Sequence, residues 1–361
     1  MKNISYLVCV FLLIFGMEVR AEEPDYLELS WKEVARKMPD EWYGSVDAAK
    51  VAENVILYQK DVGGWPKNLA MHQALSRRAK SLIKASAKDY GATIDNEATT
   101  LEMRFLARVY ALQGGEELRR SFIKGLDYLL EAQYDNGGWP QFYPVRNQKH
   151  YSVHITYNDN AMVNVMNLLK DVYEGKEFAA LQLPSNYMEQ ARASFDKGVE
   201  AILATQIVVN GEPTVWCAQH HRETMLPLQA RAYELPSFSG SESAGITLLL
   251  MDIDKPSDKV IAAVEAAVSW FETNKIEGFR VDWFMDENGE MDRKLVADPD
   301  SGPLWARFYD LDNGKPFFCD RDGVKKWSME EISQERRGGY AWYTEQGAKV
   351  LKRYPKWKKT L

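Results

Sequence analysis

A repeated pattern of Gln, a turn and Trp constrains the fold of this chain more than any other feature. Its copies are Gln59…Gly63-Gly64-Trp65-Pro66, Gln133…Gly137-Gly138-Trp139-Pro140 and a degraded third copy, Gln206…Gly211…Trp216. The tryptophans are 74 and 77 residues apart, at positions 65, 139 and 216. This period exceeds the roughly 20 to 50 residues of a solenoid unit but suits two helices and a long loop. The repeat therefore predicts a ring of helical hairpins.

Apolar residues recur at helical spacing along much of the chain. The helices that this periodicity predicts are Leu101 to Leu112, Leu118 to Gln133, Ala161 to Tyr173, Tyr187 to Gln206, Ala244 to Met251 and Val260 to Asn274. Two of them share a finer pattern, Lys124-Gly125 and Lys197-Gly198, with a Gln eight residues after each Gly. The matched phase supports an internal repeat.

A second signature opens the helix that follows each Trp loop. It is Thr93-Ile94-Asp95-Asn96-Glu97-Ala98 in one copy, Thr156-Tyr157-Asn158-Asp159-Asn160-Ala161 in the next and, more weakly, Ser239-Gly240-Ser241-Glu242-Ser243-Ala244. Consecutive antiparallel hairpins place such connections at the same end of a bundle. We therefore expect the Trp loops and the acidic helix starts to gather on one face.

The character of the chain changes after about Glu277. Phe279 to Phe284, Ala306 to Leu311 and Lys315 to Cys319 alternate like short strands, and Asp312-Asn313-Gly314 predicts a hairpin between the last two. Ser328 with Glu331 forms a capping-box pattern that opens a last helical region. We expect a small β-containing elaboration of the same domain.

The first 21 residues are typical of an export signal. Lys2 precedes an apolar run from Tyr6 to Gly16, and Val19 and Ala21 suit a cleavage site before Glu22. The run is shorter than the roughly 20 residues that span a bilayer. We therefore expect one catalytic domain over residues 22–361, exported to the periplasm or the extracellular space, with no stable membrane insertion.

Charge and cysteine content narrow the function further. The formal net charge of −7 argues against a nucleic-acid partner, because such a partner selects a basic surface. Only Cys217 and Cys319 follow the export signal, so there is no disulfide framework and no Cys-rich zinc site. Whether these two pair is left open.

The residues that could carry chemistry have structural alternatives. Asp95 and Asp159 precede helices, where they would act as N-caps, or they could converge as oxygen ligands for Ca²⁺. Arg222, Arg231 and Arg307 could be salt-bridge partners or could bind substrate carboxylates in a bidentate manner. Trp65 and Trp139 could pack on sugar rings or brace their loops, and we favour bracing.

Several blocks of the chain resemble the signature blocks of family 10 pectate lyases. They are Gln59 to Asn68, Thr93 to Arg104, Gly125 to Pro144, His154 to Met162, Val215 to Pro236 and Pro303 to Tyr309. The resemblance covers most of the chain in order. It implies a mainly α, (α/α) toroid-like fold and Ca²⁺-dependent β-elimination of polygalacturonate, giving 4,5-unsaturated oligogalacturonides.

The resemblance also implies roles for individual residues. Asp95 and Asp159 match positions around the catalytic Ca²⁺, and Arg231 matches the Brønsted base. Arg307 matches a clamp on the substrate carboxylate. The remaining expected substrate contacts are Lys67, His154, Asn160, Arg222 and Tyr309.

The implied chemistry requires one unusual property. An arginine normally keeps its proton, with a pKa of about 12.5 or more, so a base role needs a desolvated or cation-flanked Arg231 or an alkaline optimum. Two alternatives remain: a non-catalytic protein that binds acidic polysaccharides, and a toroidal terpene-cyclase-like enzyme. This sequence lacks the Asp-rich acid motif that a terpene cyclase would need. We expect the protein to act as a monomer.

Overall fold

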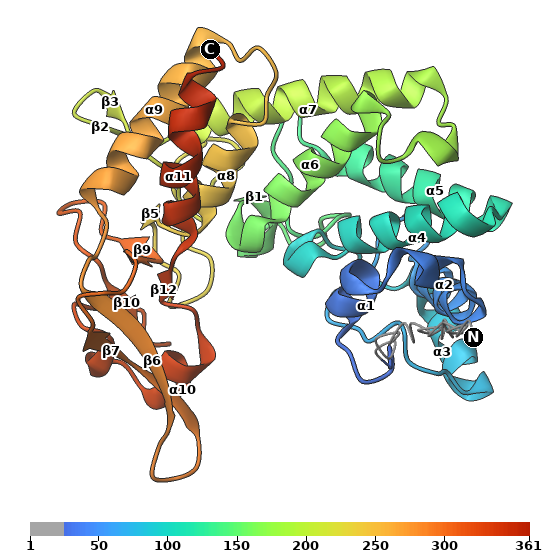
Figure 1. Ribbon diagram of the computed structural model, residues 1–361, viewed down its shortest axis with the longest axis horizontal. Helices are drawn as coiled ribbons and strands as arrows, with labels where there is room; N and C mark the ends of the chain where they lie inside the picture. Colours follow the sequence, from blue (N-terminus) through green and yellow to red (C-terminus); the bar gives the residue numbers. More distant parts are fainter. Residues whose placement is uncertain (1–24) are drawn as a thin grey trace, which may run out of the picture.

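The computed structural model describes residues 25–361, so the expected export signal lies outside the described residues. Helices follow one another around an arc in Figure 1, from α1 and α2 through α4–α5 and α6–α7 to α8, α9 and α11. Within the described part of the chain, no helix is long and apolar enough to cross a membrane. The architecture is the mainly α, toroid-like arrangement that the repeat predicted.

The helices form two rows. One row contains the three helices that end at a repeat Gln, and α9 and α11 continue it. Its members pack side by side in the order α2 (Val46–Tyr58), α5 (Glu116–Ala132), α7 (Ser185–Thr205), α9 (Asp258–Thr273) and α11 (Gln346–Lys358). The helices that begin after the acidic turns form the other row: α4 (Thr100–Gln113), α6 (Ala161–Glu174) and α8 (Glu242–Leu250). Two short helices, α1 (Trp31–Lys37) and α3 (Arg77–Ala85), flank the first hairpin.

The helices expected from periodicity all form, and their ends lie within two residues of the expected ends. The periodicity did not indicate α3 or α11, for different reasons. Helix α3 is short and mostly charged, and none of its residues is buried. Helix α11 contains Pro355, a residue that ordinarily ends a helix.

The Gln and Trp side chains of the repeat lock neighbouring hairpins together. Trp65, Trp139 and Trp216 are fully buried, and each indole Nε1 donates to a carbonyl of the preceding helix, at Val55, Leu129 and Ile202. Each Gln amide donates to a carbonyl of its own loop and to one in the next helix of the row, at Ser121, Ser194 and Ala263. Bracing of the loops, rather than stacking on sugars, is therefore confirmed for Trp65 and Trp139.

A fourth Trp makes the same contacts between hairpins and was not predicted from the sequence. Trp305 is fully buried and donates from Nε1 to the carbonyl of Phe271 at the end of α9. Its ring lies against Gly347 in α11, where an added Cβ would come within 2.6 Å of the indole. Gly125 and Gly198 give Trp65 and Trp139 the same close approach. The missing signal is the Gln, which does not precede Trp305 at the repeat spacing.

Short strands follow α9 and complete the fold. The longest pair, β6 (Phe279–Met285) and β7 (Met291–Ala297), forms an antiparallel hairpin that projects from the helices in Figure 1. Two-residue strands make the other sheets: β1 (Ile155–Thr156) with β4 (Gln219–His220), β2 (Val208–Val209) with β3 (Glu212–Pro213), β5 (Phe238–Ser239) with β9 (Phe308–Tyr309), β8 (Trp305–Ala306) with β12 (Tyr343–Thr344), and β10 (Phe318–Cys319) with β11 (Lys325–Lys326).

The expected β-containing elaboration is present, with corrections in detail. The expected hairpin between 306–311 and 315–319 forms as a short antiparallel pairing: Tyr309 bridges Pro316, and the N–H groups of Asp310 and Phe317 donate to the carbonyls of Lys315 and Phe308. Strand β9 also pairs with β5 on its other edge. The capping box of Ser328 and Glu331 forms, but it opens only the 3₁₀ turn η7 (Met329–Glu331), which precedes the short helix α10 (Gln334–Gly339). Cys217 and Cys319 are buried free thiols, so they do not pair.

Candidate active site

The acidic signatures form two adjoining 3₁₀ turns, η3 (Asp95–Glu97) and η5 (Asn158–Asn160). Asn96 and Asp159 occupy equivalent places with left-handed φ angles of 53° and 52°, a conformation that concentrates at functional sites. Neither Asp95 nor Asp159 caps a helix: the former pairs with Lys67, and the latter accepts from Asn158 and Arg307. The N-cap interpretation is therefore wrong for both.

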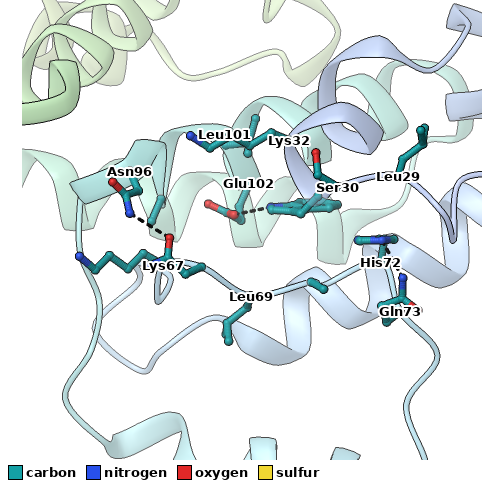
Figure 2. Close-up of a pocket in the computed structure, with 14 residues that line it drawn as sticks. Leu29, Ser30, Lys32, Lys67, Leu69, His72, Gln73, Asn96, Leu101 and Glu102 are labelled. Atoms are coloured by element: carbon teal, nitrogen blue, oxygen red, sulfur yellow. Dashed lines mark hydrogen bonds between the residues drawn. The ribbon is translucent and has the colours of Figure 1, made fainter. Parts of the chain in front are cut away.

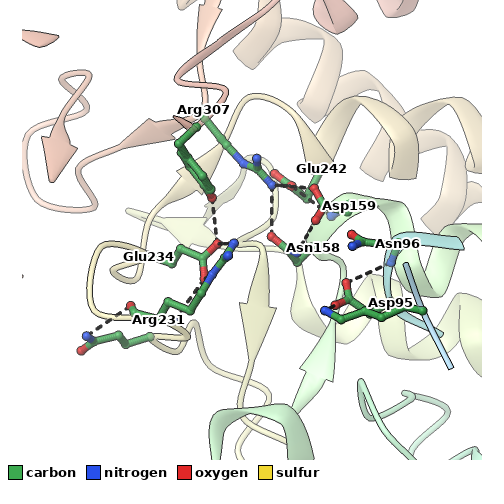
Figure 3. Close-up of polar contacts among 11 residues, drawn as sticks. Asp95, Asn96, Asn158, Asp159, Arg231, Glu234, Glu242 and Arg307 are labelled. Carbon is green, nitrogen blue, oxygen red and sulfur yellow. Dashed lines mark hydrogen bonds and ion pairs between the residues drawn. The ribbon is translucent and has the colours of Figure 1, made fainter. Parts of the chain in front are cut away.

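Arg307 ties the second acidic turn to α8. Its Nη2 lies 3.0 Å from Asn158 Oδ1, 3.1 Å from Asp159 Oδ1 and 2.6 Å from Glu242 Oε1 (Figure 3). Burial would lower the pKa of this guanidinium, but the charges of Glu242 and Asp159 and the nearby Tyr340 more than offset that effect and raise it. Arg307 is thus a buried, permanent cation, and its role as a substrate clamp stays a prediction.

Arg231 is held by a carboxylate rather than by cations. Its Nε donates to Glu234 Oε2 at 2.7 Å, its Nη2 contacts Glu234 Oε1, and that oxygen also accepts from the Tyr340 hydroxyl at 2.8 Å (Figure 3). Burial alone would lower the pKa of Arg231, but the hydrogen bonds and charge of Glu234 raise it above its ordinary value. In this arrangement Arg231 keeps its proton. The other cation of the same cavity, Lys67, is paired with Asp95.

These segments enclose a cavity of about 80 Å³. Its lining comes from both acidic turns, the loop after Trp65 and the loop after β4: Lys67, Asp95, Asn96, Gln141, Tyr151, Asn158, Asp159, Gln219, Ala230, Arg231 and Glu234. The structure thus brings together Lys67, Asp95, Asp159 and Arg231, as expected for one face of the hairpins. Two cations and three carboxylates meet in a small space, where fixed charges act strongly on a bound ion.

The other expected contacts lie elsewhere. His154 and Arg222 adjoin each other, with the Arg222 N–H donating to His154 Nδ1 at 3.3 Å and its guanidinium donating to Gln148. Burial, with His221 and Arg222 nearby, lowers the pKa of His154. Neither residue lines the cavity.

Asn160 and Tyr309 are also outside the cavity. The Asn160 side chain packs on Gly245, where an added Cβ would meet Asn160 Oδ1 at 2.0 Å. The expected substrate contact at Tyr309 is wrong, because its ring is only 2% exposed and its hydroxyl donates to the Asn274 carbonyl while accepting from the Ala306 N–H. Tyr309 instead braces the backbone around β8 and β9.

Several cavity residues were missed from the sequence, among them Gln141, Tyr151, Gln219 and Glu234. Glu234 lies three residues after Arg231, so the spacing of a charged pair in a turn could have indicated it. Tyr151 lies in an irregular segment between the second Trp loop and η5, and nothing in its surroundings in the sequence marks it. Glu242, by contrast, follows from the third copy of the acidic signature.

The side-chain oxygens that line the cavity are of the kind that Ca²⁺ binds. The carboxylate and amide oxygens of the lining are the hard ligands that Ca²⁺ takes, six to eight at a time. Among the residues that the structure describes, no three His, Cys, Asp or Glu side chains gather as a metal-binding group. Asp95 and Asp159 fit Ca²⁺ in the chemistry of their oxygens, but they would supply only part of a coordination shell.

Comparisons with known proteins agree on one relationship. Residues 59–351 match the family model described as pectic acid lyase. The solved family 10 polysaccharide lyase from Cellvibrio cellulosa is similar, with 34% identity, a TM-score of 0.76 and coverage of 90% of this chain and 97% of that one. An aspartate-to-alanine mutant of family 10 polysaccharide lyase from the same organism, in complex with trigalacturonic acid, gives the same identity and TM-score with coverage of 90% and 95%. No curated protein matches.

Proposed function

The chain belongs to the pectic acid lyase family, and from that premise we propose that it cleaves polygalacturonate by Ca²⁺-dependent β-elimination. The observation that carries the proposal is the cavity in which Lys67, Asp95, Asp159 and Arg231 meet. These side chains come from four separate segments of the chain. Their mixture of cations and carboxylates suits a substrate that carries one carboxylate per sugar.

The reaction removes the proton on C5 of a galacturonate unit and expels the O4 oxygen of the glycosidic bond. The electron pair of the broken C5–H bond forms the C4=C5 double bond, and the departing oxygen takes up a proton. Negative charge develops on the substrate carboxylate, so fixed positive charges beside it stabilise the transition state. We propose that the Lys67 ammonium, on the cavity wall, supplies such a charge when it is shared between Asp95 and the substrate carboxylate.

In this proposal, Asp95 and Asp159 are the protein ligands of Ca²⁺. When bound, Ca²⁺ would neutralise the substrate carboxylate and so make the C5 proton more acidic. Asp95 is buried and paired with Lys67, whereas the Asp159 side chain is 41% exposed and paired with Arg307. Both pairings fix the carboxylate oxygens while leaving lone pairs for further contacts.

We propose Arg231 as the group that accepts the C5 proton. Its side chain is 40% exposed and lines the cavity beside Lys67, which suits contact with a sugar ring. Because Glu234 holds Arg231 in its protonated form, the proposal requires that this ion pair loosens when substrate binds or that the reaction proceeds at alkaline pH. Arg231 and Glu234 thus form the part of the site whose ionisation limits the rate.

We also propose that residues 22–361 are a single exported domain. One cluster of buried apolar side chains extends from Trp31 to Trp357 and includes both helical rows, which supports a single unit. The apolar leader before Glu22 supports export.

Purified protein incubated with polygalacturonate and Ca²⁺ at alkaline pH should produce the ultraviolet absorbance of a 4,5-unsaturated uronate, and chelation should abolish it. Arg231→Ala should lower kcat at least about 100-fold, the usual contribution of a positioned acid–base group. Arg192→Ala, on the exposed surface of α7, is the matched control. If the wild type binds polygalacturonate but produces no absorbance change, the protein only binds the polysaccharide, and the lyase proposal is refuted.

A further inference from the structure

A second, larger pocket adjoins the candidate active site. It has a volume of about 410 Å³, within the range of roughly 300 to 1,000 Å³ typical of small-molecule sites. It lies between α1, the segment from Lys67 to Gln73 and the start of α4 (Figure 2). Lys67 and Asn96 line both this pocket and the cavity, so one extended ligand could reach both.

The polar groups inside this pocket have unused hydrogen-bonding atoms. Glu102 is 2% exposed; its Oε1 accepts from Trp31 Nε1 at 2.7 Å, while Oε2 has no partner in the part of the chain that the structure describes (Figure 2). His72 is 3% exposed, stacks on Trp31 with ring centroids 6.2 Å apart, and has no partner for Nδ1 among the same residues. Buried polar atoms are rarely left unpaired, so these two call for a ligand or water.

The charges of the pocket favour a neutral ligand group. Burial raises the pKa of Glu102 to about 7, against the hydrogen bond from Trp31. Burial also lowers the pKa of His72, which disfavours an imidazolium there. A substrate carboxylate would meet repulsion from ionised Glu102. The two lysines of the lining, Lys32 and Lys67, are already paired with Glu97 and Asp95. A hydroxyl group can bond to Glu102 in either protonation state, and an ester carbonyl can accept from protonated Glu102, without this cost.

The apolar part of the lining favours a methyl group on that neutral unit. Leu29, Leu69, Ala98 and Leu101 line the pocket alongside the Trp31 ring. Transfer of one methyl group from water to such surroundings strengthens binding about fourfold. A free galacturonate unit offers no such group, whereas its methyl ester is uncharged and carries one.

We propose that this pocket is a subsite for a methyl-esterified galacturonate unit, near the free uronate that occupies the cavity in the same chain. The inference rests on the proposed substrate class, because it assumes a galacturonate polymer in the cavity. It gives the enzyme a preference for partly esterified pectin, with the ester methyl against the leucines and the sugar oxygens facing Glu102 and His72.

Titration calorimetry of the full chain tests the subsite without turnover, in the presence of a chelator. The ligands are two oligogalacturonides of equal length, one fully acidic and one with a single internal methyl ester. The wild type should bind the ester about fourfold more tightly than the acid. Ala70→Trp, which fills the pocket from an exposed position, should bring this ratio close to one. The exposed Ala74, on the same segment but outside the pocket, gives the matched control Ala74→Trp.

A second variant keeps the test valid if Ala70→Trp does not fold. Leu69→Asp leaves the pocket open but places a charge against the methyl group, so it should also lower the ratio about fourfold. The subsite is overturned if the wild type binds the ester no better than the acid, or if neither pocket variant lowers the ratio. Absence of unsaturated product from polygalacturonate and Ca²⁺ would refute the lyase proposal alone, because this binding ratio does not depend on turnover.

Discussion

Replacement of Glu102 by Gln should stabilise the fold at alkaline pH relative to the wild type, and much less so at acid pH. The Glu102 side chain is buried on α4 and is held by a single hydrogen bond from Trp31. Burial raises its pKa from 4.5 to about 7, in spite of that bond. Gln has nearly the same shape and keeps an oxygen that can accept from Trp31, but it has no proton to lose.

The pH window follows from the direction of the shift. Because the folded state holds the Glu102 proton more tightly than the unfolded chain, this carboxyl contributes its full stability below a pH of about 4.5 and loses it as pH rises through about 7. A rise in this pKa from 4.5 to about 7 corresponds to about 3 kcal/mol, most of which is lost between about pH 5 and pH 8.5. The advantage of Glu102→Gln over the wild type should grow by most of that amount across the same interval.

Urea titrations at the two pH values, followed by circular dichroism, give the free energies of unfolding needed for the comparison. Glu131→Gln, on the exposed surface of α5, is the matched control and should change the free energy by no more than about 0.5 kcal/mol at either pH. An advantage of Glu102→Gln that stays constant with pH would refute the reasoning. It would mean that nearby cations or water stabilise ionised Glu102 as well as the unfolded chain does.

Three further substitutions test the lock, the buried arginine and the base. Gly198→Ala should destabilise the fold by about 1 to 3 kcal/mol in urea titrations, because its Cβ would come within 3.2 Å of the Trp139 ring; an unchanged midpoint would contradict this close packing. Arg307→Gln should cost about 3 to 5 kcal/mol by leaving two carboxylates without their cation, and a loss below 1 kcal/mol would show that water replaces it. Glu234→Gln removes the charge that raises the pKa of Arg231, so the ascending limb of the kcat/KM profile, where activity rises as the base loses its proton, should move to lower pH; a fixed ascending limb would exclude Arg231 as the base.

The helical part of the fold could be predicted because its signals are local. Apolar periodicity defined α4 to α9, and the Gln and Trp pattern defined their register. The signature before each helix also placed Asp95 and Asp159 on one face correctly. These predictions needed only the spacing of residues within about 80 positions, the length of one repeat.

The parts of the site that could not be predicted depend on contacts between distant, irregular segments. Tyr340 reaches Glu234 across 106 residues, from a short segment with no periodicity of its own. Glu102 lies on a regular helix, and only its neighbour Trp31, 71 residues earlier, reveals that it is buried in a pocket. The predicted substrate contact at Tyr309 was wrong because the sequence does not indicate which face of this short strand is buried.

The Gln amides of the repeat donate only to main-chain carbonyls, in their own loop and in the next helix. In the first two copies the receiving serines, Ser121 and Ser194, also donate from Oγ to the Gln Oε1. Every residue carries a carbonyl, however, so the bonds from the Gln amide do not depend on that side chain. The third copy illustrates this: Gln206 keeps both bonds although its loop lacks Gly-Gly and its receiving residue is Ala263 where the others are serines. Hairpins joined in this way can diverge in sequence, and exchange the loops that carry the chemistry, without losing their alignment.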